Sequence, residues 1–100
     1  MDAQLKKGLL DLMVLASLKY NDSYGYKIIQ DISSIMDISE STLYPILKRL
    51  EKQTLVKTYN ATHNSRIRKY YQITASGNDK LSQSNEDFQE IKRLYDFILR

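Results

Sequence analysis

The spacing of the apolar residues changes twice along this chain of 100 residues, and these changes constrain the fold more than any other feature. As far as about Gln53, apolar side chains recur every three or four residues, which is typical of helices that bury one face. Between Leu55 and Thr74 they alternate with polar residues, as in β-strands, and from Leu81 the helical spacing returns. The sequence therefore predicts three helices, a β-hairpin and a final helix, in a mainly α fold of the α+β class.

Polar breaks and capping residues divide the helical part into three segments. Apolar residues form two stripes between Gln4 and Leu18, so the first helix needs packing partners on two sides. Ser23 and Ser39 are the expected N-caps of the second and third helices, because a serine hydroxyl accepts a free N–H group of the first turn. The third helix is expected to run to about Gln53. Pro45 lies inside it without an N–H to donate, so we expect its first turns to bend or loosen.

The hairpin is predicted from two segments rich in Val, Ile, Thr and Tyr. They run from Leu55 to Asn60 and from Ile67 to Thr74, on either side of a turn-like stretch from Ala61 to Ser65. Alternation along the second strand separates the side chains into two faces. The inward face is expected to hold Ile67, Tyr71 and Ile73, and the outward face Arg66, Arg68 and Tyr70.

The final helix, for which Thr74 is the expected N-cap, carries a heptad pattern. Its apolar residues recur at the a and d positions of a coiled coil over about three heptads. No obvious partner for this seam exists in the rest of the chain, so we expect a symmetric homodimer. The alternative is that the seam covers the core of its own domain. The expected dimer contacts are Leu81, Phe88, Ile91, Leu94, Tyr95 and Ile98.

Positive charge is concentrated in the third helix and the hairpin. The whole chain has 15 Lys and Arg against 12 Asp and Glu, but between Ser41 and Tyr70 seven basic residues accompany one acid, Glu51. Such a charge run can simply be a solvated face. Here, however, burial of the apolar stripe of the third helix leaves hydroxyl and amino groups on its outer face, and such groups bind phosphates and base edges.

The order of elements and this outer face together predict a winged helix-turn-helix whose third helix enters the major groove of DNA. Residues 1–76 would form the DNA-binding domain and residues 77–100 the dimerisation helix. The expected DNA contacts are Tyr24, Ser41, Thr42, Tyr44, Lys48, Lys52, Asn64, Arg66 and Arg68.

Some of these residues also have a purely structural interpretation. Tyr24 either touches the DNA backbone or packs in the core. Arg68 either binds a phosphate or forms an ion pair with an acid of a neighbouring helix. His63, at the expected loop tip, is expected to be merely exposed, and Tyr71 to belong to the core.

The residue types argue against catalysis and against a metal site or other cofactor. The chain has no cysteine and one histidine, and its acidic residues show no pairing beyond helix caps and solvent faces. We therefore expect no enzyme activity. The apolar segment from Leu9 to Leu18 is interrupted by Asp11 and is too short for a membrane span, so a cytoplasmic protein is expected.

Five short motifs follow one another along nearly the whole chain. They are Leu9-Leu10-Asp11, Tyr24-Gly25-Tyr26-Lys27-Ile28, the eleven residues from Ser41 to Glu51, Arg68-Lys69-Tyr70-Tyr71 and Ile73-Thr74-Ala75-Ser76-Gly77. The set resembles the PadR family of bacterial transcriptional regulators. The resemblance implies a winged-helix domain whose final helix packs against a partner subunit, in the branch with one short dimerising helix.

Two departures from the family pattern stand out. Thr54 replaces the glycine that the family usually has before the first hairpin strand, so the turn there is expected to differ. The chain also lacks the tryptophan with which some members bind flat hydrophobic ligands, although Phe88, Tyr95 and Phe97 could line a small pocket for a hydrophobic or aromatic effector.

The functional prediction is an effector-responsive repressor that binds a near-palindromic operator as a homodimer. The alternative is a winged-helix module that binds protein or a small molecule without binding DNA. The basic segment favours the first, because a protein-binding helix more often exposes apolar anchors.

Overall fold

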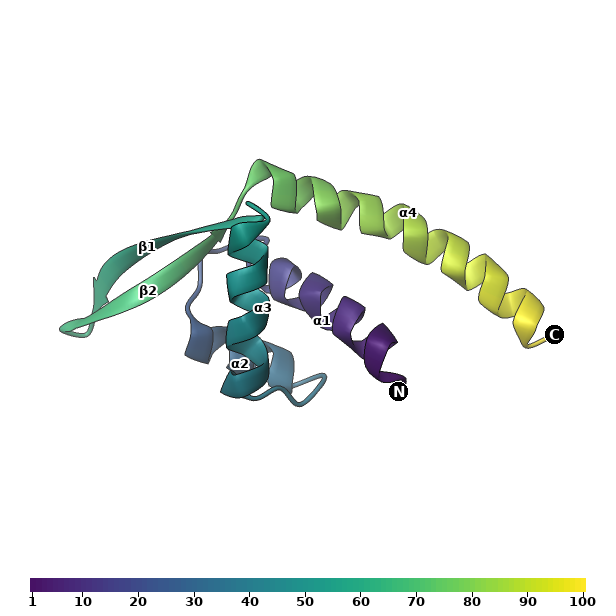
Figure 1. Cartoon of the computed structure of the whole chain (residues 1–100), viewed down its shortest axis with the longest axis horizontal. Helices are drawn as coiled ribbons and strands as arrows, with labels where there is room; N and C mark the ends of the chain where they lie inside the picture. Colours follow the sequence, from purple (N-terminus) through teal and green to yellow (C-terminus); the bar gives the residue numbers. More distant parts are fainter.

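The computed structural model describes all 100 residues and contains the predicted order of elements (Figure 1). These are α1 (Ala3–Ser17), α2 (Gly25–Ser33), α3 (Glu40–Lys52), β1 (Val56–His63), β2 (Arg66–Ile73) and α4 (Ala75–Ile98). Three helices followed by an antiparallel hairpin form a winged helix-turn-helix, so the predicted fold class is confirmed. None of the helices combines the length and the apolar character that a membrane crossing needs.

Two of the three predicted helix caps are confirmed. The Ser39 hydroxyl accepts a hydrogen bond from the N–H of Thr42 at 3.3 Å, and Thr74 accepts one from Gly77 at 3.1 Å. The cap at Ser23 is wrong. α2 begins one residue later than that cap would require, because the backbone of Ser23 instead exchanges two hydrogen bonds with Tyr71 of β2, at 3.1 and 2.7 Å. Pro45 leaves α3 continuous.

The core lies where α1, α2 and α3 meet the base of the hairpin. The apolar stripe of α3 is buried, as are the inner residues of α1. The stripe consists of Leu43, Ile46, Leu47 and Leu50. Burying a large aliphatic side chain contributes about 1.5 to 3 kcal/mol, so this cluster dominates the stability of the domain. Its members are Leu10, Val14, Leu15, Leu18, Ile28, Ile32, Ile38, Leu43, Ile46, Leu47, Leu50, Leu55, Val56 and Tyr71.

The hairpin is longer than predicted. Its strands pair from Val56 with Ile73 to His63 with Arg66, and the turn is only Asn64-Ser65, with φ of 52° and 64°. Two positive φ values at the centre of a two-residue turn are those of a type I′ hairpin. The strand residues beyond the predicted ones are Ala61, Thr62, His63 and Arg66. They are exposed or half-buried near the tip, so they carry no apolar alternation that would reveal a strand.

The expected inward position of Ile67 is wrong. Its side chain is 76% exposed, because it lies near the tip of the hairpin, beyond the reach of the core. Tyr71 is buried and Ile73 is half-buried, as the alternation predicted.

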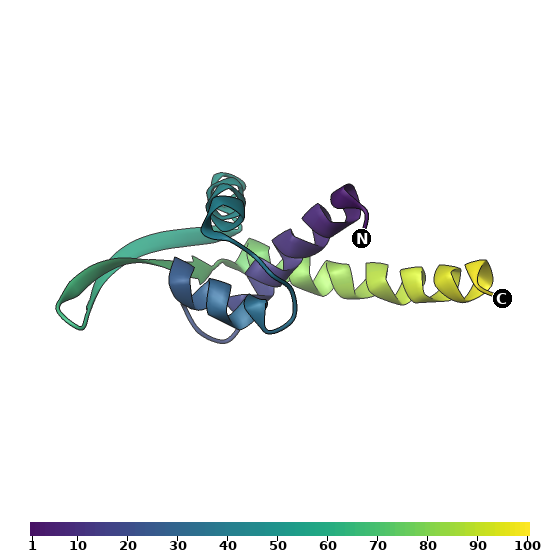
Figure 2. The ribbon, with the colours of Figure 1, turned by 90° about the horizontal axis from the view of Figure 1, so that it is seen from below.

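α4 leaves the base of the hairpin and projects beyond the domain (Figures 1 and 2). It starts at a close contact: a Cβ on Gly77 would overlap the carbonyl oxygen of Leu55 and the side chain of Ile73. Leu81 still packs against the core of its own chain. The apolar residues from Phe88 onward are exposed.

Candidate nucleic-acid interface

The outer face of α3 carries the polar residues expected on it. Ser41, Thr42, Tyr44, Lys48 and Lys52 are all exposed, because the apolar stripe holds the opposite face against α1 and α2. At the start of the helix, the capping hydroxyl of Ser39 lies 2.9 Å from the Ser41 hydroxyl and 3.2 Å from that of Thr42. This end of α3 therefore presents a cluster of hydroxyl groups to solvent.

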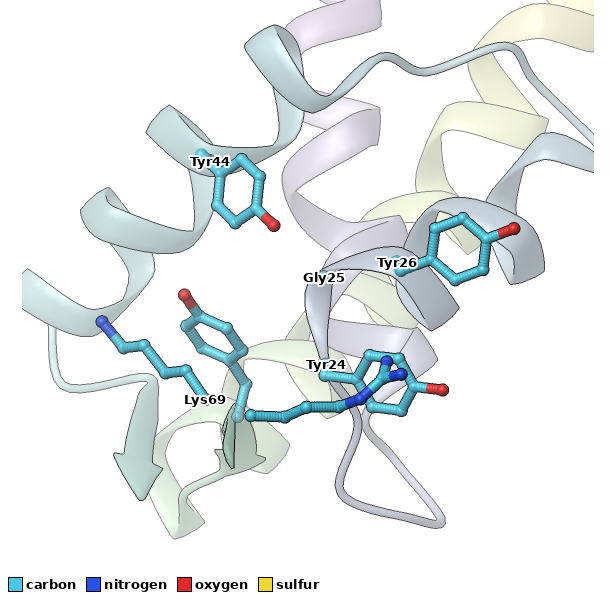
Figure 3. Close-up of a pocket in the computed structure, with 7 residues that line it drawn as sticks. Tyr24, Gly25, Tyr26, Tyr44 and Lys69 are labelled. Carbon is cyan, nitrogen blue, oxygen red and sulfur yellow. The ribbon is translucent and has the colours of Figure 1, made fainter. Parts of the chain in front are cut away.

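Tyr44 is held by a close approach of α2 to α3. A Cβ on Gly25 would lie only 2.5 Å from the Tyr44 hydroxyl, so the absence of a side chain at the start of α2 makes room for this ring. Figure 3 shows Tyr44 directed from α3 toward the start of α2. This explains why glycine stands between the two tyrosines at the beginning of α2.

Glu51, the single acid of the basic segment, faces the hairpin. It accepts a hydrogen bond from Thr58 at 3.1 Å and lies 3.9 Å from the Lys69 ammonium group. Glu51 therefore ties the end of α3 to both strands and offsets part of the Lys69 charge. Both ions are exposed enough that the pair itself contributes little stability.

The guanidinium of Arg68 lies over the ring of Tyr24, 4.3 Å from its centroid, and its Nε atom is buried without a hydrogen-bond partner. Arg68 forms no ion pair with a helix acid, so that alternative is wrong. Tyr24 is half-buried at the edge of the core. A DNA contact by either residue stays a prediction.

An aromatic row that sequence reasoning missed extends from Tyr24 across the hairpin. Tyr70 meets Tyr24 edge-on at 5.5 Å and stacks on Tyr59 at 5.6 Å, with 13° between the stacked rings. The Tyr59 hydroxyl donates to Asp22 at 2.6 Å, and this bond raises the pKa of Tyr59. Tyr59 and Tyr70 are cross-strand partners. Had the sequence indicated that the turn is only Asn64-Ser65, the strand register would have predicted this pair. His63 is exposed, as expected, with its ring 6.2 Å from Tyr24.

A hollow of about 240 Å³ lies between the start of α2, α3 and β2 (Figure 3). A tyrosine hydroxyl is protonated at neutral pH and can donate a hydrogen bond, and burial raises the pKa of Tyr71 in the wall of this hollow further. Phenolic donors together with two cations suit an anionic group such as a phosphate. The lining residues are Tyr24, Gly25, Tyr26, Tyr44, Arg68, Lys69 and Tyr71.

The hairpin tip and the final helix present the other expected site residues. Asn64 and Arg66 are exposed at and beside the turn. On α4, five of the six expected dimer residues are exposed, from Phe88 at 42% to Ile98 at 73%. The sixth, Leu81, is half-buried against its own domain.

Residues 14–83 match the sequence pattern of the transcriptional regulator PadR-like family. The chain belongs to this family. Among solved structures, a Streptococcus mutans protein is 43% identical to this PadR-like chain, with a TM-score of 0.84 over 93% of this chain and 88% of its own. A PadR family transcription regulator from Clostridium difficile is 30% identical, with a TM-score of 0.85 over 91% of this chain and 98% of its own. A transcriptional regulator from Clostridium thermocellum is also 30% identical, with a TM-score of 0.87 over 100% and 99%.

The family match covers the elements that form the candidate interface. It begins within α1, includes α2, α3 and both strands, and ends shortly after Leu81. The resemblance drawn from the sequence motifs is thereby confirmed, and this PadR-like protein is a member of a family of transcriptional regulators.

Proposed function

We propose that this PadR-like protein is a sequence-specific DNA-binding regulator whose α3 enters the major groove. The observation that carries the proposal is the set of free cations on α3 and the hairpin. Of the seven basic residues between Ser41 and Tyr70, Arg49 and Lys69 form ion pairs and the other five do not. Unpaired Lys and Arg beside a protruding helix suit a phosphate backbone. We assign the exposed Lys48 to a base edge, because a lysine ammonium group can donate to guanine O6 and N7.

The proposed regulator acts as a homodimer. Residues 1–76 serve as the DNA-binding domain and residues 77–100 as the dimerisation helix. The exposed apolar residues of α4 support this arrangement, because an isolated helix would leave them in water. A two-fold dimer would place its two α3 helices in major grooves one helical turn apart, about 34 to 36 Å, or a multiple of it, and would favour a near-palindromic operator.

Repression in response to a small molecule completes the proposal. Phe88, Tyr95 and Phe97 are exposed aromatic residues of α4, and together with their partner copies they could hold a hydrophobic or aromatic effector. Such a ligand would release the operator only through a difference in its affinity for the free and DNA-bound conformations. This role would place the protein with the chromosome, in the bacterial cytoplasm.

The alternative of a protein-binding module without DNA binding lacks support on α3. Interface anchors are mostly large aromatic or aliphatic side chains. Among the large apolar side chains of α3, only Tyr44 is exposed.

Fluorescence anisotropy tests the proposal, with a labelled duplex from the promoter of the protein's own operon and a random duplex of equal length. We expect tighter binding to the promoter duplex and a steep loss of affinity for both duplexes as salt increases. Lys48→Ala should reduce the preference for the promoter, whereas Lys52→Ala should weaken both complexes alike. Binding that is independent of salt, or equal for both duplexes, would refute sequence-specific DNA binding.

A further inference from the structure

The N-terminal turns of α1 lie on the opposite side of α3 from the hairpin (Figures 1 and 2). In the view of Figure 2, α3 protrudes from the body, with the hairpin on one flank and the start of α1 on the other. The start of α1 is thus the third element beside the exposed face of α3. Its residues are not among the contacts expected from the sequence.

One face of α1 meets α3 at this place. Lys6 and Lys7 each lie three or four residues from both Ala3 and Leu10, so the four residues share a side of the helix. Leu10 is buried in the core, which fixes the position of the two lysines one turn earlier. The four residues line a hollow of about 450 Å³ together with Ser41, Thr42, Pro45, Ile46 and Arg49 of α3.

The free charge of this hollow comes from the two lysines. Arg49 is paired with Asp11, 2.5 Å away, whereas Lys6 and Lys7 are exposed and form no ion pair. Asp37 lines an adjoining hollow with Lys6 but makes no ion pair with it. The carboxylate of Asp2 accepts a hydrogen bond from Leu5 at the start of α1. Two cations with flexible stems thus remain available to an anion beside α3.

We propose that Lys6 and Lys7 bind backbone phosphates of DNA on the flank of α3 opposite the hairpin. The inference rests on the proposed DNA-binding function of α3. A helix in the major groove, about 12 Å wide, has a phosphate backbone on each side. The hairpin lies toward one of these backbones and the start of α1 toward the other. Contacts of this kind position the protein on the duplex and carry no sequence information.

A charge-removal experiment tests the proposal on the full chain. Lys6→Gln/Lys7→Gln removes both charges while keeping good helix formers. The matched control, Lys19→Gln/Lys80→Gln, removes two exposed charges beyond the other end of α1 and on α4. We expect the first variant to bind promoter and random duplexes more weakly by the same factor. Its plot of log affinity against log salt should be shallower by about 0.9 for each phosphate that the variant no longer binds.

The outcomes separate this inference from the proposed function. Wild-type protein that binds neither duplex would overturn both. Salt-dependent binding by the wild type, with equal slopes for the Lys6/Lys7 variant and the control, would overturn the role of α1 alone. A weakening confined to the promoter duplex would also contradict a phosphate contact.

Directed DNA cleavage provides a second test, because the chain has no cysteine and accepts a single label. An iron chelate would be attached to Lys7→Cys on α1, to Thr62→Cys near the hairpin tip and to Lys80→Cys on α4. We expect labels at positions 7 and 62 to cut the backbone on opposite flanks of each half-site, and the label at position 80 to cut neither. Cleavage from position 62 without cleavage from position 7 would overturn the proposal.

Discussion

Arg68 of β2 places its guanidinium 4.3 Å above the centroid of the Tyr24 ring, which lies just before α2. The same ring meets Tyr70 edge-on and lies 6.2 Å from the ring of His63, so Tyr24 joins the hairpin to the helical core through three contacts. The orientation of the hairpin relative to α3 therefore depends on Tyr24, outside both elements, as well as on the direct contacts of Glu51 with both strands. A DNA contact by Arg68 would be made by a side chain that is already positioned.

Replacing the Tyr24 ring should destabilise the domain. Tyr24→Leu is expected to lower the free energy of unfolding by about 1 to 2 kcal/mol, because it removes the cation–π contact with Arg68 and the aromatic pairs with Tyr70 and His63. Tyr24→Phe keeps the ring and should cost less than half as much. Urea denaturation measures both. Equal stability of Tyr24→Leu and the wild type would show that these contacts contribute nothing.

Thr54 is expected to be a destabilising residue. It follows α3 with a φ of 60°, where a β-branched side chain is strained. The N–H groups of Thr54 and Leu55 donate to the carbonyl oxygens of Glu51 and Leu50, which is the Schellman motif of a helix end. Thr54→Gly should raise the free energy of unfolding by about 1 kcal/mol. Thr54→Ala keeps a Cβ and should gain less. A lower stability of Thr54→Gly would mean that the Thr54 side chain stabilises this turn.

Replacement by alanine should destabilise the protein at Gly77 and stabilise it at Gly8, although both glycines lie within helices. A Cβ on Gly77 would overlap the backbone of Leu55, so Gly77→Ala must displace the start of α4 and should cost about 2 kcal/mol or more. Nothing lies within 4 Å of a Cβ on Gly8, so Gly8→Ala should stabilise by up to about 1 kcal/mol through helix propensity. Thermal unfolding of the two variants measures both effects. Equal changes in melting temperature would contradict the close contact between Gly77 and Leu55.

The sequence predicted a residue's role correctly where that role depends on residues nearby in the chain. The caps at Ser39 and Thr74 and the buried stripe of α3 follow from neighbours three or four residues away, and all were predicted correctly. Ser23 failed as a cap because its backbone pairs with Tyr71, which is 48 positions distant in the chain. Ile67 failed because alternation gives the face of a strand but not how far the core extends beneath it.

The candidate site shows the same division. The exposure of Ser41, Tyr44 and Lys48 followed from helical periodicity alone. The stacking of Arg68 on Tyr24 and the position of the α1 lysines beside α3 depend on how separate elements pack, which no local pattern records.

Stability should fall when the pH rises above about 10, the ordinary pKa of tyrosine. The hydrogen bond to Asp22 raises the pKa of Tyr59, and burial raises that of Tyr71. Both hydroxyls are thus held protonated in the folded protein at a pH where the unfolded chain has already released those protons. Stability from these groups is present below a pH of about 10 and disappears as the pH passes through the raised pKa values. Ultraviolet titration should show two late-ionising tyrosines, of which Asp22→Asn shifts one toward the ordinary pKa and Tyr59→Phe removes the same one. Two late-ionising tyrosines in Asp22→Asn, or in Tyr59→Phe, would contradict the assignment.

Charge in the seam of α4 should separate the proposed dimer without unfolding the domain. Ile91 and Leu94 are each more than half exposed and lie outside the core cluster, so Ile91→Lys/Leu94→Glu leaves intact the packing on which the fold of one chain depends. Analytical ultracentrifugation at micromolar concentration should find a dimer for the wild type and a monomer for this variant, with unchanged helix content by circular dichroism. Glu90→Lys/Arg93→Glu reverses an exposed ion pair on the same stretch of helix and should remain dimeric. A monomeric wild type, or a variant that sediments like the wild type, would show that these residues do not join two subunits.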